Sequence, residues 1–185
     1  MADSQQGLHD TLDAVWVRLQ RGVTDRAAPA RHPVLATTGR HGFAEARLVV
    51  LRGADRRRGR LEVHTDRASA KVVELVASPG ATLLVWDAAA QLQIRLRAWV
   101  EVLDPEACAA AWALVPDQAR AQYGGEPLPG RPIAAPDLHQ PAADGARFAA
   151  LDCAIAEIET LQLGPPPRRA LFTAAEGWCG RWLVP

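Results

Sequence analysis

Hydrophobic positions recur at two different spacings along the chain. Between residues 8 and 23 the apolar side chains stand three or four apart, which predicts an amphipathic helix within residues 1–28. From residue 91 to residue 102 apolar and polar residues alternate, which predicts a long strand with one buried face. Shorter apolar runs bounded by Gly or Pro predict strands over residues 34–38, 43–52, 60–65, 81–86, 148–163, 168–173 and 178–184. Irregular alternation within the run over 148–163 predicts a bulge in that strand.

Helices are predicted to interrupt the strands at two further places. Residues 69–77 form one of them, with Val72, Val73 and Val76 expected to face inward. The other begins after Asp104, a residue type that caps helix N-termini. Because helices and strands do not alternate regularly, a doubly wound parallel sheet is disfavoured. A mostly β fold, an antiparallel β-barrel with peripheral helices, fits the pattern better.

One segment has the composition of a loop. Residues 124–146 carry closely spaced Pro and Gly, which are incompatible with a continuous helix or a central strand. We expect this Pro/Gly-rich loop to cover a site. No internal repeat is visible, and at this length we expect a single domain over residues 1–185.

Composition excludes several classes of protein. Of the 185 residues, 49% are apolar and 23% are charged, as in an ordinary globular domain. No apolar run approaches the ~20 residues that span a bilayer, and the polar N-terminus is unlike a signal peptide, so we expect a cytoplasmic protein. Twenty-one basic residues balance twenty-one acidic ones, which argues against nucleic acid or a membrane as partner. The scattered cysteines and histidines show no metal-ligand spacing, so we expect no metal site.

One group of residues points to specific chemistry. Thr65 and Ser69 bring hydroxyls to the place where a predicted strand runs into a helix, and Lys71 is the single lysine of the chain. Backbone N–H groups at a helix N-terminus favour an anion, most commonly phosphate. Arg47, on a neighbouring strand, offers a planar fork of donors, and Gln93 offers an amide that suits the edge of a heteroaromatic ring. These residues predict a site for a phosphate joined to a flat polar heterocycle.

A purely structural interpretation of the same residues stays open. In that interpretation Thr65 and Ser69 cap the helix, Lys71 is solvated, and Gln93 faces water. No phosphate-binding glycine loop, zinc motif or nucleophile motif occurs elsewhere to decide between the two.

The order of four segments resembles a known family. The segments are Arg47–Arg52, His64–Lys71, Trp86, and Gln93–Leu96. In this order and spacing they resemble the pyridoxamine 5'-phosphate oxidase-like family of FMN-binding split barrels. The residues from 168 to 185 are loosely similar to the last two strands of that family.

The resemblance implies an FMN site with named contacts. Ser69 and Lys71 would bind the phosphate, Gln93 would contact the isoalloxazine ring, and Arg169 would reach the flavin from the second subunit of a homodimer. One arginine of the family pattern is replaced by Ala70. The full set of cofactor-binding residues implied in this way is Arg47, Leu48, Val49, Val50, Arg52, His64, Thr65, Ser69, Lys71, Gln93 and Arg169.

The substrate residues of the family are missing. Authentic pyridoxine-phosphate oxidases carry a Tyr, an Arg and a Ser spaced by four, and the corresponding positions here are Ala111, Val115 and Ala119. A later Arg-x-His of the family falls in the prolines 165–167. We therefore expect a relative that keeps the flavin and is not an authentic pyridoxamine-phosphate oxidase.

The position of Trp99 gives further support to a homodimer. It stands on the polar face of the long strand, where an indole is costly to leave in water. Either a second subunit covers it or the N-terminal helix partly buries it.

Two functions are consistent with these expectations. The first is an FMN-dependent oxidoreductase acting on an unidentified small organic substrate, with the flavin supplying the chemistry. No side chain is identified as a catalytic acid or base. The alternative is a non-catalytic protein that binds flavin, haem or a deazaflavin for storage or sensing. A split barrel without a cofactor is a third interpretation.

Overall fold

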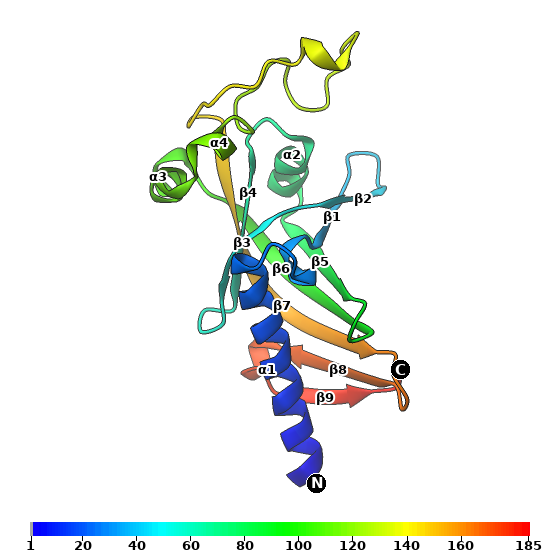
Figure 1. Ribbon diagram of the computed structural model, residues 1–185. Coiled ribbons are helices and arrows are strands. Elements are labelled where there is room, and N and C mark those ends of the chain that lie inside the picture. The colour runs from blue at the N-terminus through cyan, green and yellow to red at the C-terminus, as the bar shows by residue number, and fades with distance from the viewer. Residues whose placement is uncertain (1) are drawn as a thin grey trace.

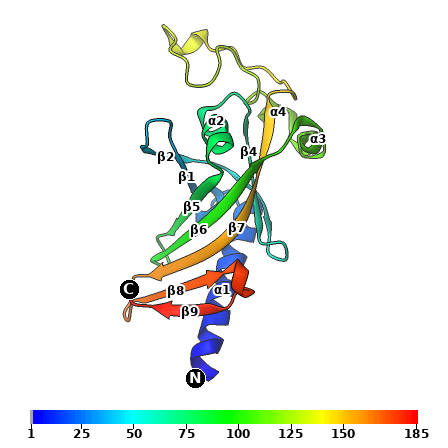
Figure 2. The same cartoon turned by 180° about the vertical axis from the view of Figure 1, so that it is seen from behind.

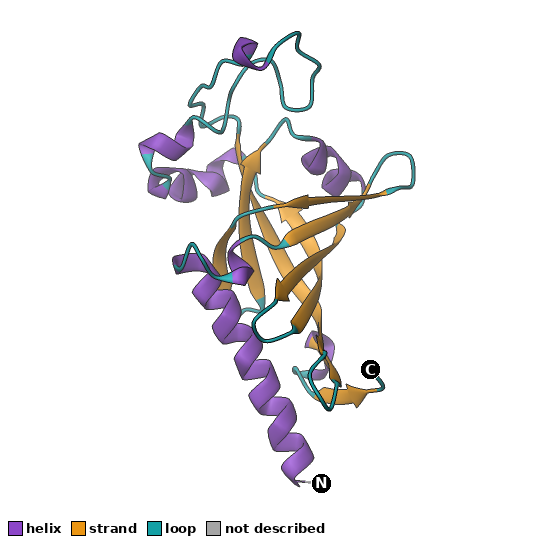
Figure 3. Ribbon diagram, turned by 45° about the vertical axis from the view of Figure 1, so that its right-hand side comes forward, coloured by secondary structure: helices purple, strands orange, loops and turns teal. Residues whose placement is uncertain are grey.

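A curled antiparallel sheet forms the body of the protein (Figure 1). The computed structural model describes residues 2–185. The strand order is β2-β1-β5-β6-β7-β4-β3, and β8 and β9 extend the sheet from β7. The strands are β1 (Val34–Thr38), β2 (Ala44–Leu48), β3 (Leu51–Asp55), β4 (Arg60–Asp66), β5 (Gly80–Asp87), β6 (Leu92–Val102), β7 (Phe148–Gln162), β8 (Arg168–Thr173) and β9 (Gly180–Leu183). The predicted mostly β, antiparallel barrel is confirmed, with its helices at the periphery (Figure 3).

The bulge predicted in the last long strand lies in β7, where it divides the sheet. Opposite Arg97 and Ala98 of β6, the register of β7 skips one residue between Ile155 and Glu157. Before the bulge β7 pairs with β4, and after it β7 pairs with β8. A bulge bends its strand and increases the local twist. The bend therefore lets one strand belong both to the barrel and to the β8–β9 extension.

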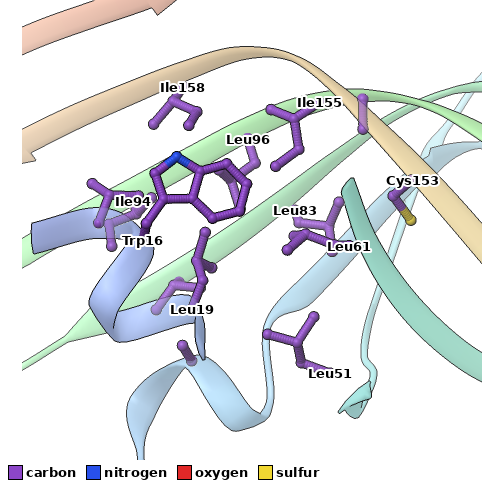
Figure 4. Packing of buried hydrophobic residues seen from close by; sticks show 14 of the residues in the cluster. Trp16, Leu19, Leu51, Leu61, Leu83, Ile94, Leu96, Cys153, Ile155 and Ile158 are labelled. Atoms are coloured by element: carbon purple, nitrogen blue, oxygen red, sulfur yellow. The ribbon is translucent and has the colours of Figure 1, made fainter. Parts of the chain in front are cut away.

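The core fills the inside of the curled sheet. Trp16, on the long helix α1 (Ala2–Thr24), is 1% exposed and lies among Ile94, Leu96 and Ile158 (Figure 4). Gly22 permits close contact near the end of this helix, since a Cβ there would lie 2.7 Å from the backbone of Ala30. The predicted amphipathic N-terminal helix is thus confirmed, and it begins earlier than the apolar pattern indicated.

The single strand predicted over 43–52 is wrong. The chain breaks at Val49 and Val50 into β2 and β3, which lie at opposite ends of the sheet order. The Val49 N–H donates to the carbonyl of Pro33 at 3.0 Å, so it bonds at the start of β1 while β3 goes on to pair with β4. The run is apolar throughout although only Val49, in the break, and Leu51 of β3 enter the core, whereas Leu48 of β2 stays exposed.

The helix α2 (Ala70–Ala77) presents a different face from the one predicted. Val72 and Leu75 are buried, whereas Val73 is 40% and Val76 is 73% exposed. Glu74 shares the buried face because its carboxylate is bound by polar groups of β1 and β2. The inward assignment of Val73 and Val76 is therefore wrong.

The remaining helices surround the upper end of the sheet. α3 (Pro105–Leu114) is capped by Asp104, which accepts a hydrogen bond from the N–H of Ala107 at 2.8 Å, as predicted. A short helix, α4 (Asp117–Arg120), follows it and was not predicted.

The Pro/Gly-rich segment 124–146 projects beyond the sheet as a loop (Figure 2). Short 3-10 turns are η1 (Pro29–Arg31), η2 (Pro136–Leu138) and η3 (Ala174–Glu176). Across residues 2–185, no helix is both long and apolar enough to cross a membrane.

Candidate functional site

Thr65, Ser69 and Lys71 meet where β4 runs into α2. The Lys71 ammonium donates to Thr65 Oγ1 at 2.9 Å, and that oxygen lies 3.2 Å from Ser69 Oγ. Ser69 has the backbone conformation of an N-cap residue, yet its hydroxyl makes no cap hydrogen bond to the first turn of α2. The structure therefore does not support the capping interpretation. It leaves the N-terminus of α2, the two hydroxyls and the ammonium group together.

Arg47 lies close enough to Lys71 to affect its pKa, and Glu74 holds it in place. Arg47 Nη2 donates to Glu74 Oε2 at 2.9 Å, and the Thr37 hydroxyl donates to the same oxygen at 2.6 Å. Arg47 also donates to the Thr37 hydroxyl. Glu74 is 8% exposed and lies one helical turn from Lys71. We call Arg47, Thr65, Ser69 and Lys71 the α2 cluster.

The α2 cluster has an excess of positive charge. Burial lowers the pKa of Lys71, the nearby Arg47 guanidinium lowers it further, and Glu74 and Asp66 oppose the shift. No carboxylate among the described residues forms an ion pair with Lys71. Of the two acids that act on Lys71, Glu74 is paired with Arg47 and Asp66 with Arg147. An anion placed here would relieve the repulsion between the two cations.

A buried ion pair fixes the turn before α2 to the Pro/Gly-rich loop. Asp66 accepts from Nε and Nη2 of Arg147 at 2.9–3.1 Å, and from the N–H groups of Ala68 and Gly124 at 2.7 and 3.0 Å. Asp66 is 8% exposed. The two ends of the loop are therefore held against the end of β4, beside the α2 cluster.

Gln93 and Arg169 lie together on another part of the sheet. Register places Trp86, Gln93, Leu161 and Arg169 in one row across four adjacent strands. Residues opposite each other in antiparallel strands point to the same face. We call this side of the sheet, which also carries Arg95, Arg97 and Trp99, the outer face.

Charged pairs and indoles cover the outer face. Glu159 accepts from Arg95 and from Arg169, whose Nε lies 3.0 Å from Oε1. Burial opposes ionisation of Glu159, but the hydrogen bonds from both arginines outweigh it and hold the pKa of Glu159 below its usual value. Trp99 is 63% exposed, so its burial under α1 is excluded. It lines an open groove of about 570 Å³ that reaches Thr37 of β1.

The structure separates Gln93 from the α2 cluster. The Val100 N–H of β6 bonds to Pro79, just after α2, and Gln93 stands seven residues further back along the strand. At ~3.3 Å per residue, Gln93 lies about 23 Å along β6 from Val100, towards the end of the strand that points away from α2 (Figure 1). Within one chain, the predicted contact to a ring and the predicted contact to a phosphate therefore lie far apart.

His64 and Arg52 face a third region, a pocket of about 260 Å³ beside α3 and α4. His64 Nε2 lies 2.6 Å from Glu62 Oε1, and its ring contacts Phe148 edge-on with centroids 4.8 Å apart. The hydrogen bond to His64 lowers the pKa of Glu62 against the effect of burial. Thr65, by contrast, points to the α2 cluster, so the side chain of His64 is not part of that cluster. The same pocket is lined by Ala111, Val115 and Ala119.

Leu48, Val49 and Val50 lie at the break between β2 and β3. Leu48 is 67% exposed and belongs to the outer face, whereas Val49 is buried. Their role as backbone contacts to a cofactor stays a prediction.

Four residues of the site were missed from the sequence. They are Thr37, Glu74, Asp66 and Arg147. An acid on the buried face of a short helix, one turn after the single lysine, was the available signal for Glu74. No local pattern links Asp66 to Arg147, because 81 residues separate them.

Comparison with known proteins identifies the family. A sequence profile of the domain described as "Pyridoxamine 5'-phosphate oxidase, FMN-binding domain" matches residues 13–104, about half of the chain. The fold matches the crystal structure of a pyridoxamine 5'-phosphate oxidase-related, FMN binding protein from Nostoc punctiforme with a TM-score of 0.76. That match has 25% identity and covers 94% of this chain and 96% of the other. The chain belongs to the pyridoxamine 5'-phosphate oxidase-like split-barrel family.

Two further proteins are similar to this chain, one in sequence and one in fold. A pyridoxine/pyridoxamine 5'-phosphate oxidase of Synechocystis sp. is 33% identical over 91 residues, which are 49% of this chain and 41% of that enzyme. The match thus spans less than half the length of this curated relative. PhzG from Burkholderia lata 383, solved with tetrahydrophenazine-1-carboxylic acid, matches with a TM-score of 0.70 and 18% identity over 95% of this chain and 91% of that one. The similarity to PhzG is therefore a similarity of fold alone.

Proposed function

We propose that this protein binds FMN at the α2 cluster and uses it as an oxidoreductase on a small organic substrate. The observation that carries the proposal is the meeting of Arg47, Thr65, Ser69 and Lys71 at the uncapped N-terminus of α2. Two hydroxyls, an ammonium group and a guanidinium form a donor set that fits a phosphate monoester. The FMN-binding relative from Nostoc punctiforme supports FMN as the molecule that carries the phosphate.

Each residue has a separate part in holding the cofactor. Lys71 supplies a compact charge and Arg47 a planar fork. The hydroxyl of Thr65 accepts from Lys71, and the hydroxyls of Thr65 and Ser69 are donors for phosphate oxygens. Glu74 keeps Arg47 in place beside Thr37. Bound FMN supplies the electron and hydride chemistry, and the protein supplies position and charge.

A homodimer completes the proposed site. Gln93 and Arg169 lie on the outer face, away from the α2 cluster of their own chain. In the proposed dimer the outer face of one subunit packs near the α2 cluster of the other, so that Gln93 and Arg169 reach the partner's flavin ring. The exposed indoles of Trp86 and Trp99 on that face, at 47% and 63%, support this arrangement.

The first test is the visible absorption spectrum of freshly purified protein, before and after addition of FMN and gel filtration. We expect retained flavin bands at one FMN per chain. A haem-like or deazaflavin-like spectrum, or a colourless protein that refuses FMN, would contradict the cofactor. Flavin that is retained but reduced by nicotinamide donors no faster than free FMN would favour storage or sensing over catalysis.

The single lysine allows a direct test of the phosphate contact. An amine-selective reagent labels Lys71 and the N-terminus, and peptide mapping separates the two products. We expect FMN to protect Lys71 and leave the N-terminus reactive. Riboflavin, which lacks the phosphate, is the matched control and should protect Lys71 far less. Equal protection by both flavins would place the phosphate elsewhere.

A further inference from the structure

Glu159 lies between two arginines on the outer face. Arg95 of β6 stands directly opposite it, and Arg169 of β8 stands opposite Leu161, two residues further along β7. Arg95 donates to Oε2 of Glu159, whereas Arg169 donates to Oε1 from Nε and Nη2 at 3.0 and 2.8 Å. One carboxylate thus connects three adjacent strands. We call Arg95, Glu159 and Arg169 the Glu159 triad.

Glu159 is more buried than its two partners. Its side chain is 12% exposed, whereas the side chain of each arginine is 33% exposed. Burial raises the pKa of Glu159, but the hydrogen bonds from both arginines lower it further, so the carboxylate is ionised at neutral pH. The Nε atom of Arg95 is also buried, and it has no hydrogen-bond partner within residues 2–185. Charges in such a position are screened less than charges at the surface.

The Glu159 triad carries a surplus of one positive charge. Its two guanidinium groups share one carboxylate, and within residues 2–185 neither of them pairs with a second acid. The arginines that β6 and β9 add to the same face each have an acid of their own, since Arg97 pairs with Glu157 and Arg181 with Glu176. The surplus charge on this part of the outer face therefore belongs to the triad.

The Glu159 triad adjoins the residues that we propose to reach the flavin ring. Gln93 precedes Arg95 by two residues on β6, so both side chains point to the outer face, with their Cα atoms about 7 Å apart. Arg169 lies in the same row across the sheet as Gln93. The surplus charge is thus next to the amide that suits the edge of the ring.

The charge beside a flavin affects how easily it is reduced. A hydride taken from a donor adds one negative charge to the ring and leaves one positive charge on the donor. A cation near the ring therefore favours the reduced form, and an anion favours the oxidised form. Glu159 has two effects of this kind, because it holds both arginines in place and cancels half of their charge.

We infer that Glu159 is a positioning residue that sets the reduction potential of the flavin bound by the partner subunit, by leaving one of two positive charges beside the ring. The inference rests on the proposed function, from which it takes FMN and the homodimer. It also gives a part in the site to Arg95, which the family resemblance did not include among the cofactor contacts.

The reduction potential of FMN bound to the wild type and to variants tests the inference, measured at neutral pH against reference dyes. We expect Glu159→Gln to favour reduced flavin about tenfold or more, because both arginines remain without an opposing carboxylate; for a two-electron couple this is a rise of about 30 mV. Arg95→Gln leaves the triad neutral and should shift the potential by a similar amount in the opposite direction. A purely structural role would not give opposite signs at the two ends of one ion pair.

Glu176→Gln is the matched control. It removes the acid from another arginine of the outer face, Arg181, but both of these side chains are more than half exposed, so solvent and salt screen the change. We expect it to alter the equilibrium by less than about twofold. Thermal unfolding shows that each variant is folded. A potential in Glu159→Gln that is unchanged or lowered, or an equal rise in Glu176→Gln, overturns the inference. If Glu159→Gln does not retain FMN, an unchanged or raised potential in Arg95→Gln overturns it.

The flavin content of the wild type separates the two proposals. If the wild type retains FMN and its potential is insensitive to both substitutions in the triad, the inference fails and the proposed function stands. If the wild type refuses FMN, the proposed function fails and the inference fails with it.

Discussion

His64 and Thr65 are consecutive residues of β4, and their side chains lie on opposite faces of the sheet. The imidazole of His64 packs edge-on against Phe148, whereas the hydroxyl of Thr65 accepts a hydrogen bond from Lys71 at 2.9 Å. One strand therefore borders two separate polar regions, the α2 cluster and the pocket beside α3 and α4. A ligand that joins the two regions would have to pass the end of β4, where Asp66 anchors the Pro/Gly-rich loop.

Lys71→Met is expected to weaken FMN binding about tenfold to a hundredfold, because a charge-assisted hydrogen bond is worth roughly 1.5–3 kcal/mol. Quenching of flavin fluorescence measures the affinity. Wild-type affinity should also fall as pH rises, and it should do so below the pH at which an ordinary lysine loses its proton, since burial and Arg47 lower the pKa of Lys71. Lys71→Arg stays charged and should bind without this alkaline loss. A change of less than twofold in Lys71→Met would rule out the phosphate contact.

Glu74→Gln is expected to destabilise the protein and make it more responsive to phosphate. Arg47 would lose the carboxylate that it contacts at 2.9 Å in a mostly buried position, at a cost of about 2 kcal/mol. For a chain of this size that corresponds to a fall in Tm of about 4–8 °C. FMN should raise the Tm of the variant by more than it raises that of the wild type. Glu101→Gln, at an exposed position, is the control, and an equal Tm in both variants would contradict the expectation.

Arg147→Met is expected to release the base of the Pro/Gly-rich loop. Asp66 would keep two backbone N–H donors but lose its two-pronged guanidinium partner, at a cost of about 3 kcal/mol for a buried pair. Limited proteolysis should then cleave within residues 124–146 much faster than in the wild type. Arg131→Met changes an exposed arginine in the same loop and should leave the rate unchanged. Similar cleavage of the two variants would show that the ion pair does not hold the loop.

Trp99→Glu is expected to weaken the proposed homodimer. The substitution replaces an exposed indole on the outer face by a charge beside Glu157, which already lines the same groove. Sedimentation equilibrium should show a rise of at least about tenfold in the dimer dissociation constant. Val17→Glu, on the exposed side of α1, serves as the control. A dimer unaffected by either change would assign the interface to another surface.

The architecture was predictable where one periodicity covered a whole element. The alternation along β6 fixed both its length and its buried face, and the irregular alternation of β7 revealed the bulge. The division of 43–52 into two strands was not predictable, because the residues around the break are all apolar: Leu48 ends β2, Val49 lies in the break and Leu51 begins β3. The break depends on the Pro33 carbonyl, a contact remote in sequence.

The candidate site was predictable only where its residues lie close together in the sequence. Thr65, Ser69 and Lys71 are close in sequence, so a local pattern revealed them and the structure brings them into contact. The role of Glu74 could not be predicted from the sequence, because its carboxylate pairs with Arg47, which lies on a separate strand. Gln93 was grouped with the cluster because its amide suits the edge of a heteroaromatic ring, and the resemblance gave it the same role. The sheet places it on the outer face instead.

The first helix and the last strand hold each other at the lower end of the molecule (Figure 1). The indole N–H of Trp182 bonds to Ser4, and Leu8 packs close to Gly180. The later turns of α1 pack instead on η1 and β3, which follow soon after it in the chain. During synthesis the helix can therefore settle only partly at first. Its first turns gain the contacts of Ser4 and Leu8 only after β9 has been synthesised.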